Sequence, residues 1–263
     1  MDKLSFGGIF LALGCILGGQ ALEGGHIGSL IQPTAFIIVI GGTIGAVMLS
    51  YPQADFIRGI KLGKTVFTEQ HADIGALVKE LVEMASIARR DGVLALEGKL
   101  ATITDPFLKR AVGFVVDGVD AVVARSALEG QIEAEFEENT MGAKVFEAGG
   151  GFAPTVGIIG AVLGLIHVME NLSNPDAIGP GIAVAFVATV YGVAAANLLF
   201  LPMATKIKRR LGLEKERKIL IAEGVLSIQE GLNPRVLEEK LIALSGGHAG
   251  PSSTDKAQLK AAA

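Results

Sequence analysis

Two long stretches without charged residues lie close together in the second half of the chain, and they constrain its fold more than any other feature. Both lie within residues 149–203, on either side of a short polar break from Glu170 to Asp176. Each is about as long as the ~20 residues that a helix needs to cross a bilayer. Because a backbone in hydrocarbon must satisfy its own hydrogen bonds, the pair predicts a transmembrane helical hairpin.

Small residues recur along one stripe of each stretch, at helical spacing. The stripes consist of Ala153, Gly157, Gly160 and Gly164 in the first stretch and Ala188, Gly192 and Ala196 in the second. Helices that associate in lipid need such stripes so that their backbones can approach closely. The hairpin is therefore expected to pack tightly against other helices.

Two further apolar runs near the N-terminus bring the expected number of spans to four. They are Leu4–Leu22 and Pro33–Ser50. A composition of 50% hydrophobic and 19% charged residues agrees with a membrane protein that has a soluble part. A cleaved signal peptide is disfavoured, because positive charge before the first run is weak and three more spans follow. The fold class is thus all-α, a polytopic membrane protein with four transmembrane helices and a helical cytoplasmic domain.

Between the second and third spans the pattern changes to that of soluble amphipathic helices. Asp73 is an N-cap candidate for a helix that Gly92 interrupts, and a second helix through Leu94–Leu100 stops near Pro106. Two further helices are expected at Phe107–Val116 and Ala121–Phe136, and a helical tail at Glu214–Leu244, broken at 231–234. The expected domains are 1–50 (spans one and two), 51–148 (cytoplasmic), 149–203 (spans three and four), 204–245 (cytoplasmic tail) and 246–263 (disordered tail).

Lysine and arginine are distributed unevenly around the spans. They flank the apolar runs at Lys3, at 58–64 and at 206–210, and they are absent from Glu23–Gln32 and Glu170–Gly179. The positive-inside rule therefore places both termini and residues 51–148 in the cytoplasm, with the chain in the cytoplasmic (inner) membrane. The two short loops then face outward.

None of the four spans carries Asp, Glu, Lys or Arg in its central portion. A membrane protein that conducts ions usually needs such a group. Either the chain is no ion pathway, or a partner brings the carboxylate. The spans do offer the hydroxyls of Thr155 and Thr189, whose ordinary role is hydrogen bonding within or between helices. Pro154 fits the first turn of a helix, and Pro202 is expected to kink one.

Motifs for catalysis, cofactors or nucleic acid are missing from the sequence. We find no metal-ligand cluster, no nucleophile with a base at suggestive spacing and no phosphate loop, and the net charge is −4. The chain is therefore not expected to be an enzyme, to hold a cofactor or to bind nucleic acid.

The chain resembles the A subunit of the flagellar motor stator, the MotA/PomA family. The resemblance covers essentially residues 1–245 and rests on matching stretches in the same order at 33–43, 88–97, 153–165, 174–180, 188–192, 196–202 and 224–235. It implies a homopentamer around a dimer of single-span B subunits (MotB/PomB type), whose transmembrane Asp accepts the ion. It also implies that ion flow drives rotation and that the cytoplasmic segment engages the rotor protein FliG.

The resemblance also assigns roles to particular residues. It places Arg89, Arg90 and Glu97 at rotor-contacting positions and makes Pro202 a hinge at the inner end of the fourth span. The residues expected along the ion pathway are Pro154, Thr155, Ala161, Thr189 and Tyr191. Without the resemblance, Arg89 and Arg90 read as a solvated pair that complements a helix dipole.

The coupling ion is expected to be the proton. In the sodium-driven branch of the family, a Thr stands where this chain has Ala161 and an Asp stands where it has Gln32. A sodium site needs several oxygen ligands, whereas proton transfer to a carboxylate does not. Losing one hydroxyl therefore favours the proton-driven branch.

Two other functions remain open on the sequence. A non-conducting membrane scaffold would also lack intramembrane charge. An energiser subunit of the ExbB/TolQ type is related, but that family has three spans, so the fourth span and the 89–97 stretch count against it.

Overall fold

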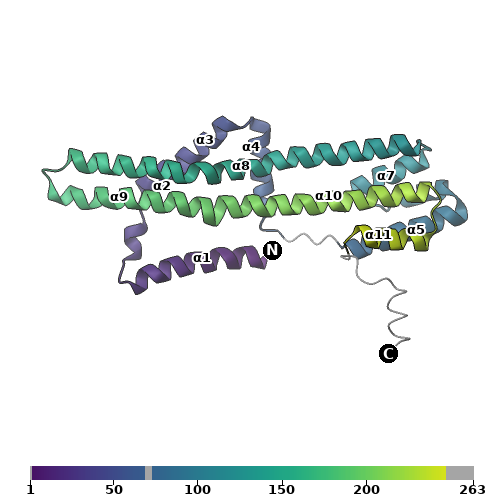
Figure 1. Cartoon of the computed structure of the whole chain (residues 1–263), viewed down its shortest axis with the longest axis horizontal. Helices are drawn as coiled ribbons and strands as arrows, with labels where there is room; N and C mark the ends of the chain where they lie inside the picture. The colour runs from purple at the N-terminus through teal and green to yellow at the C-terminus, as the bar shows by residue number, and fades with distance from the viewer. Residues whose placement is uncertain (1, 69–72, 247–263) are drawn as a thin grey trace, which may run out of the picture. The chain divides into compact units, whose positions relative to one another are not determined.

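The computed structural model describes residues 2–68 and 73–246, and every regular element within these ranges is a helix (Figure 1). The chain divides into unit 1, residues 1–69 and 138–210, and unit 2, residues 70–137 and 211–263. The elements are α1 (Lys3–Leu22), η1 (Ile27–Leu30), α2 (Pro33–Phe36), η2 (Ile37–Gly41), α3 (Gly42–Ser50), α4 (Gln53–Thr65), α5 (Ile74–Asp91), η3 (Val93–Leu96), α6 (Glu97–Leu100), α7 (Pro106–Val116), α8 (Ala121–Glu170), α9 (Pro175–Ala194), η4 (Ala195–Phe200), α10 (Leu201–Gln229) and α11 (Pro234–Leu244). The tail expected to be disordered falls, from residue 247 onward, outside the described residues.

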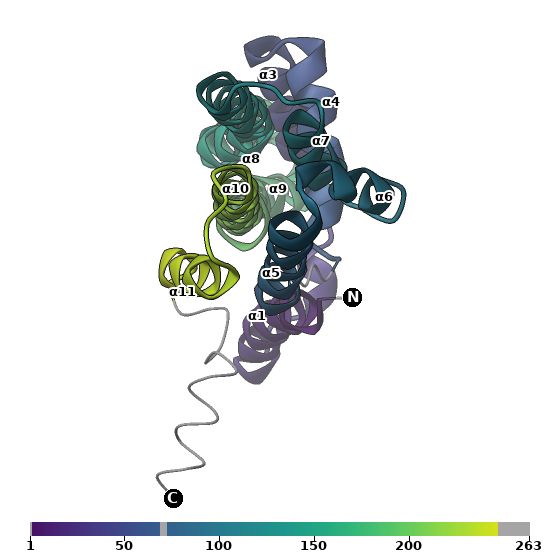
Figure 2. The same ribbon diagram turned by 90° about the vertical axis from the view of Figure 1, so that its right-hand side faces the viewer.

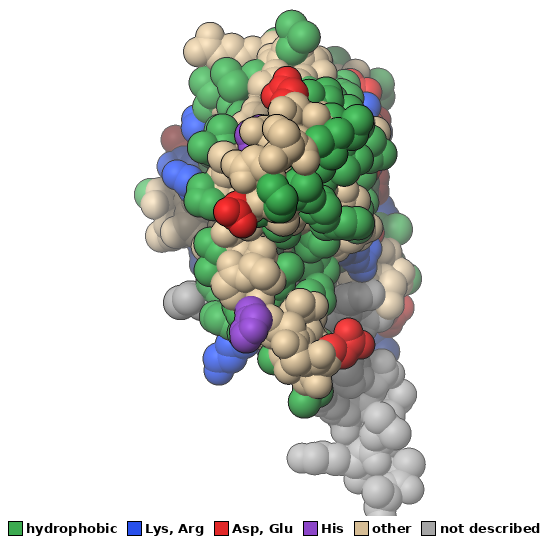
Figure 3. Space-filling view, turned by 90° about the vertical axis from the view of Figure 1, so that its left-hand side faces the viewer, with side chains coloured by type: hydrophobic (Ala, Val, Ile, Leu, Met, Phe, Trp, Pro, Cys, Tyr) green, Lys and Arg blue, Asp and Glu red, His purple; other side chains and the backbone are tan. Residues whose placement is uncertain are grey.

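Four helical segments of the described chain are long and apolar enough to cross a membrane, which confirms the predicted fold class. They are Lys3–Leu22, Ile27–Ser50, a stretch of α8 (Ala121–Glu170) and a stretch of the helix from Ile178 to Gln229. Figure 3 looks onto the end of unit 1 that carries the α8–α9 loop, where hydrophobic side chains spread over much of the visible surface. Such exposure suits a lipid environment, because lipid tails do not penalise apolar surface.

The C-terminal half of α8 and α9 form the expected hairpin, and the small-residue stripes are where they touch (Figure 1). A Cβ built on Gly157 would lie 2.9 Å from the carbonyl oxygen of Ala188, and one built on Gly164 would lie 2.8 Å from the backbone nitrogen of Ala185. Helix backbones in direct contact leave no room for a side chain. The predicted close packing is therefore confirmed.

The segment from α2 to α3 covers one side of this hairpin. Ala35 and Val39 are fully buried and pack against Val187 and Ala188 of α9. On α8, the neighbouring contact is made by Val156, whose methyl would lie 2.8 Å from a Cβ on Gly42. Five residues of this segment, η2, are π-helical, a local widening that often accompanies functional sites.

The predicted end of a helix at Phe136 was wrong, because α8 runs without interruption to Glu170. The change from polar to apolar composition near residue 148 marks a change of environment, and a helical backbone needs no break there. Pro154 consequently lies in the interior of α8 and not in a first turn. Its missing N–H leaves the carbonyl of Gly150 without its helical donor.

Glycines just before Pro154 allow α8 to approach the next helix closely. A Cβ on Gly149 would lie 2.9 Å from the ring of Phe200, and one on Gly150 would lie 2.5 Å from the side chain of Leu201. The six residues of η4 that lead to Pro202 are π-helical. An irregular turn before a proline is an ordinary way for a helix to adapt to the lost N–H.

Unit 2 has its own apolar core, built from α5, α7, α11 and parts of α8 and α10. Figure 2 shows α5 beside α11, and Leu81 of α5 reaches within 2.7 Å of a Cβ built on Gly224. The expected cap is confirmed, since the Asp73 carboxylate accepts from the N–H of Ala76 at 2.9 Å. The helix through Leu94–Leu100 is only a 3-10 turn, η3, followed by the single turn α6.

Candidate functional site

One side of the α8–α9 hairpin is left open, and it carries several of the expected pathway residues. Residues that are three, four or seven positions apart share a face of a helix, so Pro154, Ile158 and Ala161 lie together beside the packing stripe of α8. Thr189 and Val193 lie together beside the stripe of α9. In each helix, these residues come one position after the residues of the packing stripe, which turns them by about 100° around the helix axis in the same direction. Because α8 and α9 run antiparallel, the residues from both helices then lie on the same side of the hairpin.

We call these five residues the hairpin face. It lies opposite the side that contacts Gly42 through Val156, and Figure 2 shows α3 on that other side. Ile158 is 57% exposed and Val193 is 47% exposed. The face is therefore an apolar surface available to a further helix.

Thr189 supplies the hydroxyl of the hairpin face, and that hydroxyl is weakly held. Its Oγ1 donates to the carbonyl of Ala185 at 3.4 Å, well beyond the ~2.7 Å typical of O–H···O bonds. By comparison, Thr155 Oγ1 donates to Phe152 at 2.8 Å. The Thr189 hydroxyl can turn toward another acceptor at little cost.

Two of the expected pathway residues do not share the hairpin face. Thr155 lies on the side of α8 that points away from α9, and its side chain is exposed. Tyr191 lies on the α2 side of α9, where its hydroxyl donates to the carbonyl of Leu30 at 2.5 Å and accepts from the N–H of Gln32 at 3.3 Å. The Tyr191 ring also meets Phe36 edge-on at 6.3 Å. The structure therefore ties Tyr191 to the loop before α2.

Asp, Glu, Lys and Arg are missing from the hairpin along its apolar length. The carboxylates nearest to this apolar length are those of Glu147 and Glu170 in α8 and of Asp176 in α9. Within the described residues no cluster of His, Cys, Asp or Glu could hold a metal ion. The hairpin face offers one hydroxyl and two backbone irregularities, at Pro154 and η4. The hairpin face itself therefore provides no carboxylate to bind an ion.

The expected rotor-contacting residues gather at one exposed turn of unit 2. Gly92 ends α5 with φ of +86°, a conformation that only glycine adopts easily, and the chain reverses there. Arg89, Arg90 and Glu97 flank the turn and are exposed. Sequence reasoning missed Leu94, which is 68% exposed at the same turn. An apolar side chain among charges is typical of a protein contact.

The charges at this turn are incompletely paired. Arg90 forms an ion pair with Asp91 at 2.8 Å, and its hydrogen bond lowers the pKa of that carboxyl. Within the described chain, Arg89 and Glu97 form no ion pair. Lys99 of α6 pairs with Glu83 of α5 at 2.7 Å, which holds α6 against α5. The turn therefore presents free charges on a fixed backbone.

An ion pair between Asp105 and Arg217 links α7 to α10 within unit 2. The Asp105 carboxylate caps α7 by accepting from the N–H of Phe107 and of Leu108, and it pairs with Arg217 of α10. Burial alone would raise the pKa of Asp105. The Leu108 N–H and the Arg217 guanidinium outweigh this and lower it.

The comparisons with known proteins cover nearly the whole chain. Residues 6–92 match the family described as motility protein A N-terminal, and residues 99–218 match the MotA/TolQ/ExbB proton channel family. Motility protein A of Bacillus subtilis (strain 168) is 37% identical over 92% of this chain and 90% of its own. The chain belongs to the motility protein A family.

Further relatives agree with this membership. Chemotaxis protein PomA of Vibrio alginolyticus is 38% identical over 83% of this chain and 85% of its own length. A chain of the C. jejuni MotAB structure superposes with a TM-score of 0.88 at 36% identity, covering 93% of this chain and 96% of that one. A chain of the flagellar MotAB stator complex from Bacillus subtilis has a TM-score of 0.86 at 36% identity, covering both chains fully. The resemblance seen in the sequence is confirmed, and this member of the family is a membrane protein.

Proposed function

We propose that this chain is the A-type, torque-generating subunit of a flagellar stator, working with a single-span B subunit of the MotB type. The observation that carries the proposal is the hairpin face, an exposed apolar surface with one loosely held hydroxyl and no ionisable group. A helix bearing an Asp would fit against it and would supply the missing ion-accepting carboxylate. The named complexes of the similar structures are A–B assemblies, which supports the same partner.

The hairpin face also bears on the number of chains. One hairpin covers only part of a central helix, so several copies are needed to enclose a dimer of B subunits. A homopentamer satisfies this, and symmetric closed rings are the common outcome of such head-to-tail contacts. Relative rotation of ring and dimer would bring each Asp past successive Thr189 and Pro154 positions.

Protons are proposed as the coupling ion. The hairpin face has one hydroxyl, that of Thr189. A second hydroxyl could stand at position 161, but this chain has Ala161 there. A sodium ion stripped of water needs several oxygen ligands at short distance, and this face offers too few. A proton needs only the carboxylate and a path to it.

The exposed turn of unit 2 is the proposed contact with the rotor protein FliG, through Arg89, Arg90 and Glu97. This requires residues 51–148 and both termini to lie in the cytoplasm, as the positive-inside rule indicates. Free charges on a fixed backbone suit repeated, reversible contacts, because electrostatic complementarity speeds association more than it tightens binding.

The test uses a photocrosslinking residue on the hairpin face. The chain with p-benzoylphenylalanine at Ile158 is co-expressed with its B subunit and irradiated, and a crosslink to the B subunit is expected. The matched control carries the same residue at Leu11, which is 69% exposed on α1 and lies away from the hairpin face. Crosslinking from Leu11 but not from Ile158 would refute the assignment. Restored swimming in a strain without its own stator genes tests the torque function directly.

The ExbB/TolQ type of energiser is the second candidate, because one matched family includes it by name. Four apolar helical segments and the separate match of residues 6–92 to the motility protein A N-terminal family favour the stator. Rescue of an energiser mutant without rescue of swimming would reverse this preference.

A further inference from the structure

Of the three carboxylates nearest to the apolar length of the hairpin, one is in register with the hairpin face. Glu147 precedes Pro154 by seven positions, and residues seven apart share a face of a helix. Glu170 follows Pro154 by 16 positions, which turns it about 160° away around the axis of α8. Asp176 precedes Thr189 by 13 positions, about 140° away around α9. Glu147 is therefore the carboxylate that continues the hairpin face.

Lys208 of α10 pairs with Glu147 from the other helix of the hairpin. Its ammonium lies 2.6 Å from the Glu147 carboxylate. Lys208 follows Thr189 by 19 positions, and the π-helical turn of η4 between them holds one residue more than an α-helical turn. The remaining 18 residues make five full turns, so Lys208 returns to the side of the helix that carries Thr189. The ion pair therefore lies across the end of the hairpin face.

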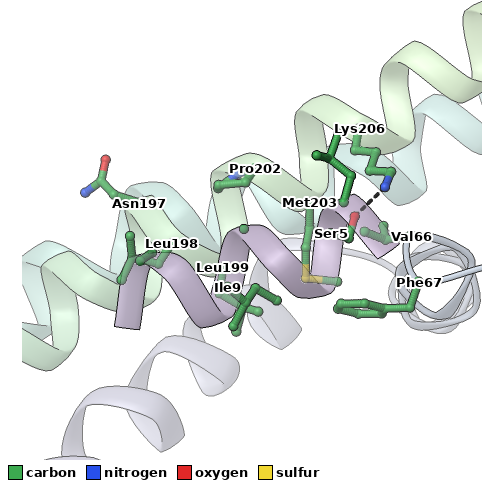
Figure 4. Close-up of a pocket in the computed structure, with 13 residues that line it drawn as sticks. Ser5, Ile9, Val66, Phe67, Asn197, Leu198, Leu199, Pro202, Met203 and Lys206 are labelled. Carbon is green, nitrogen blue, oxygen red and sulfur yellow. Dashed lines mark hydrogen bonds between the residues drawn. The ribbon is translucent and has the colours of Figure 1, made fainter. Parts of the chain in front are cut away.

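Two other basic residues of α10 are engaged elsewhere in unit 1. Figure 4 shows Lys206 reaching Ser5 of α1, and the Lys206 ammonium also pairs with Asp2. Arg210 lies 3.6 Å from the same Asp2 carboxylate. Lys208 differs from both because its partner is on α8.

The Glu147 carboxylate is open to water as well as paired. Its side chain is 42% exposed, so a proton that reaches it can leave directly to solvent. A second ionisable group nearby is the hydroxyl of Tyr51, which donates to the carbonyl of Lys144 at 3.0 Å. Burial raises the pKa of Tyr51 most, and the negative charges of Glu147 and Asp55 raise it further. Tyr51 therefore stays protonated, and Glu147 is the proton acceptor of the two.

The stretch of α8 between Pro154 and Glu147 carries glycines on the hairpin face. The two residues are about 10 Å apart along the helix axis. Between them lie Gly150 and Gly151, and nothing comes within 4 Å of a Cβ built on Gly151. The Gly150 carbonyl lacks its helical donor because of Pro154. Gly150 is buried, and a buried carbonyl without a donor is usually satisfied by water.

We propose that Glu147 receives the proton released by the carboxylic acid of the B subunit and passes it to the cytoplasm. This rests on the proposed function, in which the B subunit carries that acid. In the transfer, the acid of the B subunit loses a proton to water at the Gly150 carbonyl and becomes a carboxylate. That water passes a proton to the Glu147 carboxylate, which becomes a carboxylic acid. Glu147 then gives a proton to cytoplasmic water and returns to its ion pair with Lys208, which holds the carboxylate at the end of the hairpin face.

The experiment measures the rotation of single motors in a strain without its own stator genes, with the chain and its B subunit supplied together. Slow proton release limits speed at low load, whereas torque near stall depends on the free energy released per ion and not on the transfer rate. A positioned proton-transfer group contributes ~10²–10⁴-fold to a rate, and water can replace part of this. We therefore expect Glu147→Gln to lower speed at low load about tenfold and to keep torque near stall within about twofold of wild type.

Lys208→Met separates proton transfer from the ion pair, because it breaks the same pair but keeps the Glu147 carboxylate. An exposed ion pair contributes little, so this variant should lower speed at low load by no more than about threefold. Glu147→Asp also keeps a carboxylate and should rotate faster than Glu147→Gln. The matched control is Glu138→Gln, which removes another ion pair of α8, with Arg58 at 3.1 Å, on the opposite side of the helix. It should leave speed unchanged.

Three results would overturn the role of Glu147. They are normal speed at low load in Glu147→Gln, equal losses of speed in Glu147→Gln and Lys208→Met, and a loss of torque near stall as large as the loss of speed. Photocrosslinking from position 158 to the B subunit checks that each variant assembles. A wild-type chain that fails to rotate the motor would refute the proposed function itself, whereas wild-type rotation with an unaffected Glu147→Gln would refute only the proton-accepting role.

Discussion

Gly192→Ala should destabilise the chain although it adds only one methyl group. The new Cβ would lie 2.5 Å from the carbonyl oxygen of Ala153 and 3.0 Å from Cα of Gly157, both of them backbone atoms that no rotamer change can move. Ordinary contact begins at 3.4 Å, so α8 and α9 must separate by up to 0.9 Å (3.4 − 2.5). A gap of ~0.5–1 Å loses a quarter to a half of each dispersion contact along the seam.

We expect Gly192→Ala to lower the free energy of unfolding by about 2 kcal/mol, within the ~1–3 kcal/mol typical of overpacking. For a chain of this size that corresponds to a melting temperature about 4–8 °C lower. The assay is thermal melting of the purified full chain with its B subunit, followed by fluorescence-detected size exclusion.

Gly151→Ala is the control for Gly192→Ala, because Gly151 lies in the same membrane hairpin and has no atom within 4 Å of a built Cβ. Alanine is the better helix former by ~1 kcal/mol, so this variant should melt at the wild-type temperature or above it. Equal melting temperatures for the two variants would refute the inference that backbone contact between α8 and α9 holds the hairpin together.

Three further outcomes follow from the same structure. Because the pKa of Asp105 is lowered in the folded chain, its contribution to stability is complete above the unfolded pKa of ~3.9 and is lost as pH falls through the folded value. Asp105→Asn keeps the helix cap but should lower the free energy of unfolding by about 1 kcal/mol at pH 7, and it should weaken the fall of melting temperature at acid pH. An unchanged dependence of melting temperature on pH would contradict the ion pair with Arg217. Arg90→Glu and Glu97→Arg should each reduce swimming while leaving membrane assembly intact, whereas Lys79→Glu, earlier on α5, should not; normal swimming in both reversals would remove the rotor contact. Swimming should stop with a protonophore and continue when sodium is withdrawn, and the opposite result would show that Ala161 does not exclude sodium.

The sequence predicted the features of this fold that follow from periodicity and composition. The spans follow from uncharged length, and the packing seam follows from the spacing of Gly157, Gly160 and Gly164, because only small residues allow backbones to touch. The cap at Asp73 and the reversal at Gly92 follow from local chemistry that few other residues can supply. Each of these is decided within about one or two helical turns.

Features that depend on where other segments pack could not be read from the sequence. No local sequence feature shows that α8 continues past Phe136. The change in composition there reflects a change of environment, whereas the helix propensity of the chain persists across it. Thr155 and Thr189 look equivalent as hydroxyls beside small-residue stripes. Only the placement of the α2–α3 segment determines which side of the hairpin is left open, and Thr189 is on that side.

The absence of charge from the hairpin and the looseness of the Thr189 hydroxyl have a common physical basis. A carboxylate fixed on the hairpin would face hydrocarbon whenever its partner moved away, at a cost of several kcal/mol. On the proposed function this surface slides past a charged partner, which suits apolar side chains, a backbone irregularity at Pro154 and one hydroxyl that can change acceptor. On the proposed function the titratable group lies on the partner, so the same face can meet it repeatedly. A fixed charge at Ala161 or Val193 is therefore expected to abolish swimming while leaving the fold intact.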